Sequence, residues 1–255
     1  MARANIGTSG WSYREWLGGF YPRGLPAGRY LEHYSRQFDT VELNASFYRP
    51  LDPAAIARWV ETTADGFVFA VKGSKQITHI YKLQQPQNTL GPFLERIAGF
   101  GAKLGPILFQ LPPHWHKDTG RLASFLAALP AGQRYVVELR DPTWLADDVY
   151  ALLREHNVAF CIYDLAGFET PSIVTADFVY LRLHGSGKTR YVGSYSAEQL
   201  QRWAGEIQGW LAEGRDVYCY FDNTADGAAT RNAGELRTLV TGQPAPAGPD
   251  TLFTV

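Results

Sequence analysis

The sequence predicts an α/β fold, a single (β/α)₈ TIM-barrel-like domain, and three observations support this fold class. Eight short apolar runs recur along the 255 residues, and each run ends at a polar or small residue. Most intervals between the runs have the length of one helix with two loops, as parallel strands joined by crossover helices require. The chain length and the 45% hydrophobic content suit one closed barrel. We therefore expect one domain over residues 1–255.

The order of the apolar runs gives the order of the expected strands. They begin near Asn5, Thr40, Phe67, Gly105, Tyr135, Ala159, Phe178 and Asp216. Helices are expected between them at 27–38, 53–63, 90–100, 119–129, 143–156, 196–213 and 224–240. Two helix starts carry strong signals. Asp52 precedes Pro53 as a cap before a first-turn proline, and Ser196 with Gln199 has the pattern of a capping box.

Three segments depart from the regular alternation of strand and helix. The interval 167–177 is too short for a crossover helix, so a helical turn is expected there. Residues 191–195 have the composition of a loop over the barrel rim, and the proline-rich residues 242–255 predict an irregular tail.

Composition limits the classes of partner. The chain carries 24 basic and 25 acidic side chains, so no overall field attracts it to nucleic acid or to an anionic membrane, and any anion site is local. No apolar stretch reaches the length that spans a bilayer, and no signal-peptide core precedes the first strand, so a cytoplasmic protein without membrane contact is expected. Cys161 and Cys219 lie within separate apolar runs and are expected to be buried thiols.

The alternation of side chains along each strand predicts which residues face the barrel interior. In the seventh run, Leu181 and Leu183 suit the helix layer, so Arg182 and His184 face inward. The same alternation predicts further inward-facing residues at the ends of the other runs: Glu42, Asn44, Lys72, Gln110, Glu138, Arg140, Asp164 and Asp222.

These inward residues predict a polar ligand site at the carboxyl ends of the strands. Four carboxylates, three cations and one histidine are too polar for an ordinary packed core, because buried charges must be paired or hydrated. We assign acid-base roles to Glu138, His184 and Asp222. The expected ligand-binding residues are Trp11, Glu42, Asn44, Lys72, Gln110, Arg140, Asp164, Arg182 and Asn223. The alternative is an ion-pair network that only fixes strand register.

The loops after the first two strands are rich in aromatic residues, and Trp11 is the best candidate among them for ligand contact. No resident metal is expected, because no paired histidines on a helix and no close cysteine set occur. If a metal were bound, the conceivable ligands would be His79, His116, Glu138, His184 and Asp222. The sequence implies no particular cofactor.

The residues that carry the site also carry a family resemblance. The segments IGTSGWSYREW, FDTVELNASFY, FVFAVKGSKQITH, LGPILFQLPP, VVELRDPTW, FVYLRLHG and VYCYFDN resemble the successive blocks of the YecE-like family, also called domain of unknown function seventy-two. The resemblance covers residues 5–239 and implies a TIM-barrel-like fold with no established activity. The matching positions are Gly7, Trp11, Glu42, Asn44, Lys72, Gln110, Glu138, Arg140, Arg182, His184, Asp222 and Asn223.

Three classes of function fit these observations. The first is an enzyme, a hydrolase or lyase using carboxylate or histidine acid-base chemistry on an anionic, phosphate-bearing small molecule or nucleic-acid fragment. The second is a glycosidase or sugar isomerase, suggested by the carboxylates and aromatic loops. The third is a noncatalytic ligand-sensing or interaction module. Nucleic acid is the weaker partner, because the sequence shows no basic patch.

Overall fold

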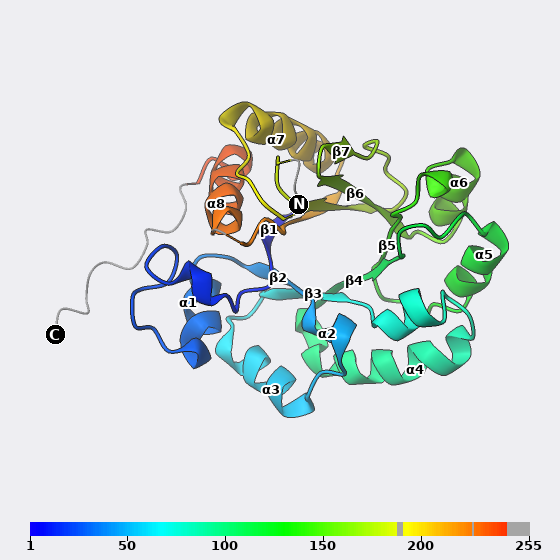
Figure 1. The fold of residues 1–255 in the computed structure, drawn as a ribbon, viewed down its shortest axis with the longest axis horizontal. Coiled ribbons are helices and arrows are strands. Elements are labelled where there is room, and N and C mark those ends of the chain that lie inside the picture. The colour runs from blue at the N-terminus through cyan, green and yellow to red at the C-terminus, as the bar shows by residue number, and fades with distance from the viewer. Residues whose placement is uncertain (188–190, 226, 244–255) are drawn as a thin grey trace.

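The computed structural model describes residues 1–187, 191–225 and 227–243. Within them, eight parallel strands close into a barrel, in the order β5-β4-β3-β2-β1-β9-β8-β6 with β6 pairing back to β5 (Figure 1). The predicted (β/α)₈ fold is therefore confirmed. The barrel strands are β1 Ala4–Ser9, β2 Thr40–Leu43, β3 Val68–Lys72, β4 Leu104–Gln110, β5 Tyr135–Glu138, β6 Ala159–Leu165, β8 Phe178–Leu183 and β9 Asp216–Phe221.

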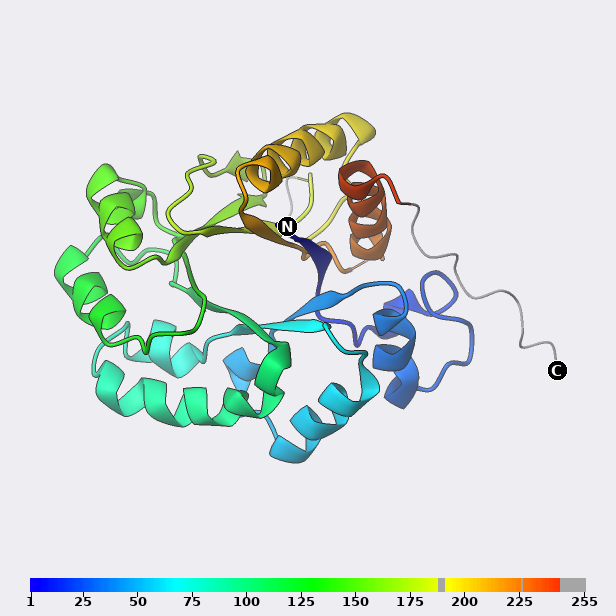
Figure 2. The ribbon, with the colours of Figure 1, turned by 180° about the vertical axis from the view of Figure 1, so that it is seen from behind.

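Helices surround the strands on the outside of the barrel (Figure 2). They are α1 Tyr30–Ser35, α2 Ala45–Tyr48, α3 Pro53–Thr62, α4 Pro86–Ile97, α5 Thr119–Ala127, α6 Asp147–Glu155, α7 Ala197–Ala212 and α8 Ala228–Thr241. Short 3₁₀ segments lie at Arg14–Trp16, Ala27–Arg29, Ala98–Lys103 and Pro142–Trp144, and a π-helical turn lies at Gln76–Ile80. Within the described ranges, no helix combines the length and the apolar character needed to cross a membrane.

Local signals fix several helix ends as the sequence predicts. Asp52 accepts a hydrogen bond from the Ala54 amide at the start of α3. Ser196 and Gln199 form the complete capping box of α7. Both satisfy amide donors that have no partner inside the helix. Gly242, with φ of 69°, ends α8, and the rest of the predicted tail lies outside the described residues from 244 onward.

Other helix boundaries differ from the prediction. The helix expected at 90–100 begins earlier, at Pro86, because a proline is compatible with the first helical turn. The helix expected from residue 224 begins at Ala228, after Gly227 adopts a left-handed φ of 73°. The segments expected as single helices at 27–38 and 143–156 are each divided between a 3₁₀ turn and an α-helix.

The segment after β6 is a hairpin, so the helical turn predicted at 167–177 is wrong. Ala166 and Gly167 both have positive φ, 54° and 80°. This combination gives the tight reversal typical of two-residue hairpin loops. The chain turns back and forms β7, Phe168–Glu169, which pairs antiparallel with the end of β6. The hairpin extends over the barrel rim and leaves Phe168 exposed there.

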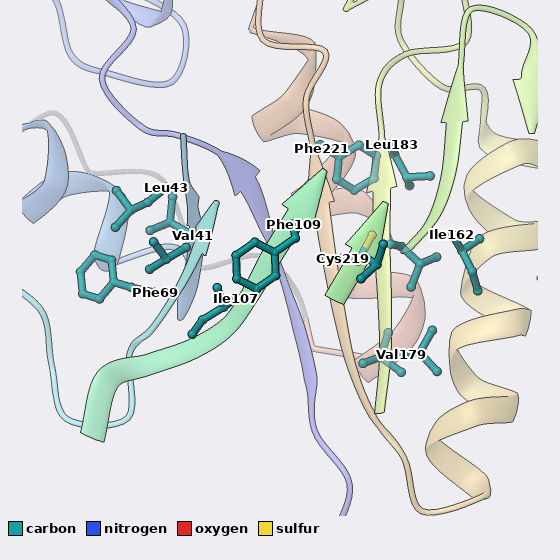
Figure 3. Packing of buried hydrophobic residues seen from close by; sticks show 14 of the residues in the cluster. Val41, Leu43, Phe69, Ile107, Phe109, Ile162, Val179, Leu183, Cys219 and Phe221 are labelled. Atoms are coloured by element: carbon teal, nitrogen blue, oxygen red, sulfur yellow. The ribbon is translucent and has the colours of Figure 1, made fainter. Parts of the chain in front are cut away.

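The two faces of the strands form two separate apolar cores. Residues such as Val41, Phe69, Phe109 and Leu183 pack between the strands and the helices (Figure 3). A smaller interior cluster fills the barrel: Ala70, Leu108, Val136, Ala159, Cys161, Ala176, Phe178, Tyr180, Tyr218 and Tyr220. Both cysteines are buried and free, as expected. The interior cluster fills the barrel below its carboxyl-end mouth, where the polar residues begin.

Candidate functional site

Arg182 on β8 is the centre of a buried charge network at the barrel mouth. Its side chain is 1% exposed and reaches three carboxylates from three strands. Nε and Nη2 bind Glu42 at 2.9 and 2.8 Å. Nη1 binds Glu138 at 2.9 Å, and Nη2 binds Asp222 at 2.9 Å. Because every nitrogen of the guanidinium already has an acceptor, Arg182 holds the site together and has no donor left for a ligand.

Glu42 in β2 is held by three side chains, those of Arg182, Tyr180 and Ser9. Tyr180 donates a 2.7 Å hydrogen bond to Oε2, and Ser9 donates one to Oε1. Burial alone would raise the pKa of this carboxyl, but Arg182 and these donors lower it. Asn44 completes the group by donating to Ser9 Oγ at 2.8 Å. The predicted inward orientation of Glu42 and Asn44 is confirmed.

Ser9 is a site residue that sequence reasoning missed. It lies at the carboxyl end of β1 in register with Glu42, and its hydroxyl contacts Glu42, Asn44 and Arg182. The alternation of side chains along the strand could have identified it, since every barrel strand places its last inward-facing residue at this mouth. Ser9 was missed because it is small and uncharged and lies among glycines and a threonine, so the first run shows no clear alternation of apolar and polar residues.

Glu138 at the end of β5 is a permanent carboxylate. Burial raises its pKa, but Arg140 and Arg182 bind both carboxyl oxygens and hold the pKa far below its ordinary range. The thiol of Cys161 lies 3.8 Å from Oε2. Glu138 therefore supplies a fixed negative charge, and its carboxylate has no proton to give at neutral pH.

His184 follows β8 and is fully buried between the two arginines. Its Nε2 lies 2.9 Å from Arg182 Nη1 and 3.0 Å from Arg140 Nη2, so this nitrogen accepts hydrogen bonds. Nδ1 lies 3.0 Å from the backbone oxygen of Asp164 and therefore carries the proton. Burial and the two cations hold the pKa of His184 well below its ordinary value. The imidazole is neutral and orients the guanidinium groups.

Lys72 differs from the arginines because it lacks an acidic partner. Its ammonium group lies over the Phe47 ring, 4.5 Å from the centroid, and has no hydrogen bond or ion pair in the described part of the chain. The residue is partly buried, and burial together with the nearby Arg182 charge lowers its pKa to about 8. A partly desolvated, unpaired cation at a barrel mouth is suited to binding an anion.

Asp222 follows β9 and is the carboxylate that titrates near neutrality. Burial raises its pKa to about 6, against the opposing effect of Arg182. Oδ2 is bound by Arg182, whereas Oδ1 has no hydrogen bond within the described ranges. The side chain remains 14% exposed. Asp222 therefore combines a free oxygen, access to solvent and a pKa suited to proton transfer.

A second unsatisfied group lies on the same side of the mouth. The Oδ1 atom of Asn44 is buried and has no hydrogen-bond partner in the described structure. Asn44 follows Leu43, which pairs with Val71, so Asn44 and Lys72 end neighbouring strands. An unused acceptor and an unpaired cation at the ends of neighbouring strands are expected where a ligand completes the hydrogen bonding.

Gln110 and Arg140 line a separate cavity of about 250 Å³ at the ends of β4 and β5, which we call the rim cavity. Both residues were predicted at the mouth. Tyr163, Phe168 and Tyr191 contribute aromatic walls. The predicted loop at 191–195 does reach the site, because the Tyr191 ring lies 5.7 Å from that of His184.

Three predicted site residues lie outside this mouth, beginning with Trp11. The indole is 8% exposed and packs edge-on against Trp59 of α3 and Phe69 of β3, at centroid distances of 5.2 and 6.4 Å. Phe69 belongs to the outer face of its strand, so Trp11 lies in the strand-helix core. The indole therefore packs away from the mouth at which it was predicted, because burial against apolar neighbours outweighs its loop position.

Asp164 and Asn223 face the opposite side of the strands from the mouth. Asp164 pairs with the outward Leu183, and its side chain hydrogen-bonds Tyr195. In β6 the side chains of Cys161 and Tyr163 face the barrel interior instead. The predicted inward orientation of Asp164 is therefore wrong, because the alternation of the strand is displaced by one residue. Asn223 follows the inward Asp222 and donates hydrogen bonds to Gly193 and Asn232, which anchors the loop and α8.

The described residues contain no group of three or more histidine, cysteine, aspartate and glutamate side chains arranged to hold a metal ion. Glu138 and His184, two of the conceivable ligands, are occupied by arginine donors. His79 instead contacts Thr78 and the Phe47 ring.

The fold and the mouth define a TIM-barrel protein with a buried arginine-carboxylate network at the carboxyl ends of its strands. The chain belongs to the family described as protein of unknown function DUF72, which it matches over residues 5–251. The resemblance seen in the sequence blocks is thereby confirmed.

Two relatives of the chain are described as UPF0759 proteins. YecE of Escherichia coli K12 is 32% identical over 142 residues, which are 55% of this chain and 50% of that protein. The match thus spans about half the length of that relative. YunF of Bacillus subtilis 168 is 22% identical over 92% of this chain and 94% of its own. Neither name states an activity.

Solved structures of the family share the fold. A DUF72 family protein from Thermotoga maritima has a TM-score of 0.77 at 24% identity, covering 93% of this chain and 99% of its own. Another from Enterococcus faecalis has a TM-score of 0.80 at 19% identity, covering 99% and 100%. At these identities the likeness shows the barrel architecture alone.

Proposed function

We propose that this protein is an enzyme that binds a small anionic, phosphate-bearing substrate at the barrel mouth and uses Asp222 for proton transfer. One observation carries the proposal: Arg182 is saturated by carboxylates, whereas Lys72 keeps an unpaired ammonium group. The sequence predicts anion binding by three cations, and the pairing of Arg182 leaves Lys72 as the main candidate. Arg140 contributes its Nη1, which has no acceptor within the described residues.

The roles of the remaining charged residues follow from their pairing. Glu138 and His184 hold the two guanidinium groups in place, so the acid-base role predicted for all three residues falls to Asp222. Its free Oδ1 and its pKa of about 6 suit a general acid or base. A glycosidase needs two carboxyl groups facing the substrate, and here Glu42 and Glu138 are both bound by arginine.

Sulfate binding tests the anion site without the complication of a titrating ligand. We expect Lys72→Met to weaken sulfate binding by about tenfold or more, equivalent to about 1.4 kcal/mol. The matched control is Lys75→Met, which removes an exposed lysine three positions along the same loop and should leave the dissociation constant within about twofold. Isothermal titration calorimetry measures both. Equal affinities for wild type and a folded Lys72→Met variant would refute the assignment.

Turnover separates an enzyme from a noncatalytic binding module. Phosphate release from a panel of phosphate monoesters should be lost in Asp222→Asn, while sulfate affinity is retained or improved because a competing negative charge is gone. Sulfate binding without turnover of any ester by the wild type would support the noncatalytic module instead.

A further inference from the structure

The rim cavity lies beside the charge network and shares Arg140 with it. It lies between the ends of β4 and β5 and the β6–β7 hairpin, and its volume is about 250 Å³. Ligand pockets usually measure about 300–1,000 Å³. The rim cavity therefore has room for one chemical group and not for a whole large ligand.

Aromatic and planar groups form the walls of this cavity. Tyr163 lies inside the mouth, and the Arg140 guanidinium lies over its ring at 4.7 Å from the centroid. Phe168 and Tyr191 line the opening and are 45% and 42% exposed. Aromatic faces and guanidinium planes both stack on planar rings. An exposed phenylalanine held on a hairpin at a cavity opening gains burial when such a ring binds.

Gln110 gives the cavity a polar contact. Its side-chain amide lines the space and has no hydrogen-bond partner within the described part of the chain. A free amide offers both a donor and an acceptor. A purely alkyl occupant would leave both unused, whereas a ring with a polar substituent would satisfy one or both.

The rim cavity adjoins the acid-base residue. Arg140 Nη2 lies 3.0 Å from His184 Nε2, and that nitrogen lies 3.6 Å from Asp222 Oδ2. Burial and the nearby Asp222 charge also raise the pKa of Tyr191. Arg140 therefore serves both places. Its guanidinium lines the cavity, and its Nη1, which has no acceptor within the described residues, can bind the anionic group of a molecule whose ring occupies the cavity.

We infer that the rim cavity binds a single planar ring that carries a hydrogen-bonding substituent, which makes the substrate a hydroxyaryl or heteroaryl phosphate. The anionic half of this inference rests on the proposed function, and the ring half rests on the cavity alone. Phe168 and Gln110 are then specificity-determining residues, the first for the ring face and the second for its substituent.

Non-hydrolysable phosphonates test the inference by calorimetry. Wild type should bind phenylphosphonate about tenfold more tightly than methylphosphonate, and 4-hydroxyphenylphosphonate more tightly again. Phe168→Ala should abolish the preference for a ring and leave methylphosphonate affinity within about twofold. Gln110→Leu should abolish only the preference for the hydroxyl group. Tyr48→Ala, which removes another exposed rim aromatic, should change none of these values.

The outcomes distinguish the two proposals. If methylphosphonate binds and the ring adds no affinity, or if the ring preference survives Phe168→Ala, the rim-cavity inference is overturned. If no phosphonate binds but neutral hydroquinone binds in a Phe168-dependent manner, the ring site stands and the anion-binding function fails.

Discussion

Each charged residue at this mouth has a character set by its partners. Arg182 contacts Glu42, Glu138 and Asp222 and compensates charges that burial would otherwise make costly. Lys72 and Asp222 are left less completely paired, and their pKa values move toward each other, to about 8 and about 6. The fully paired groups hold the mouth rigid, and the less completely paired ones are those to which the proposed function assigns ligand binding and proton transfer.

Removing Arg182 should be strongly destabilising. Arg182→Met leaves buried carboxylates without compensation, and we expect a loss of about 3–5 kcal/mol in the free energy of unfolding, measured with urea. Adding Glu42→Gln should restore part of that loss, because one uncompensated charge is then absent. The control is Arg202→Met, which breaks an exposed pair with Glu169 and should cost less than about 1 kcal/mol. A small effect of Arg182→Met would contradict the network.

The raised pKa of Asp222 predicts a pH-dependent stability difference. The folded state holds this proton more tightly than the unfolded chain, so the stabilising contribution is present at low pH and is lost as pH rises from about 4 through about 6. Relative to wild type, Asp222→Asn should therefore gain up to about 3 kcal/mol between pH 4 and pH 7. Thermal or urea unfolding across this range measures the gain.

The control for this titration is an aspartate with the opposite shift. Lys117 lowers the pKa of Asp148, so Asp148→Asn should show no gain as pH rises. A stability difference for Asp222→Asn that stays constant from pH 4 to pH 7 would show that the pKa of Asp222 is not raised in the folded protein.

At the scale of elements, the β6–β7 hairpin links backbone conformation to the proposed ring preference of the rim cavity. The turn needs positive φ at Ala166 and Gly167, and it places Phe168 at the rim cavity. The π-helical turn at Gln76–Ile80, another local departure from regular structure, follows β3 and its Lys72. Irregular segments at this end of the barrel thus surround the site, while the capped helices α3 and α7 stabilise the scaffold.

Gly167→Val should disturb both stability and ring binding. A β-branched residue at φ of 80° is strained, and we expect a cost of about 1–2 kcal/mol in unfolding free energy. The preference for phenylphosphonate over methylphosphonate should fall in parallel, because Phe168 loses its fixed position. Gly167→Asn is the matched control, since asparagine tolerates this conformation. Equal behaviour of the two variants would argue against a role for the turn geometry.

At the scale of the whole molecule, closure of the barrel brings the site together. Glu42 and Arg182 are separated by 140 positions in the sequence, yet two nitrogens of Arg182 donate hydrogen bonds to the Glu42 carboxylate. Closure also requires β1 to approach β2 closely at Gly7, where a side-chain carbon would lie 2.3 Å from the Thr40 carbonyl oxygen. The residue at position 7 is thus limited by strand packing rather than by ligand chemistry.

Gly7→Ala should therefore weaken the whole barrel. The added methyl group forces β1 away from β2, and we expect a loss of about 1–3 kcal/mol or more in unfolding free energy. Gly205→Ala in α7 is the control, because its site is open and the substitution should stabilise the helix by about 0.5–1 kcal/mol. Urea denaturation of both variants measures the contrast. Equal or greater stability of Gly7→Ala would contradict the close approach.

The sequence by itself determined the barrel, the mouth as the place where the inward charged residues gather, and the inward orientation of residues such as Glu42, Lys72, Glu138 and Arg182. It could do so because strand alternation is a local property with a fixed period. Parity failed at Asp164, where the polar end of the run lies on the outer face. The predictions for Trp11 and Asn223 also relied on their positions next to a strand end. In the structure, distant residues such as Trp59 and Asn232 determine where these side chains lie.

Only the tertiary structure decided which charges pair and which remain free. The sequence lists nearly balanced acids and bases, and that balance fits either a working site or a self-satisfied network. Barrel closure assigns three carboxylates to Arg182. It leaves the Lys72 ammonium group, Asn44 Oδ1 and Asp222 Oδ1 without a hydrogen-bond or ion-pair partner in the described residues. Pairing depends on distances between strands far apart in the chain, and no local pattern encodes those distances.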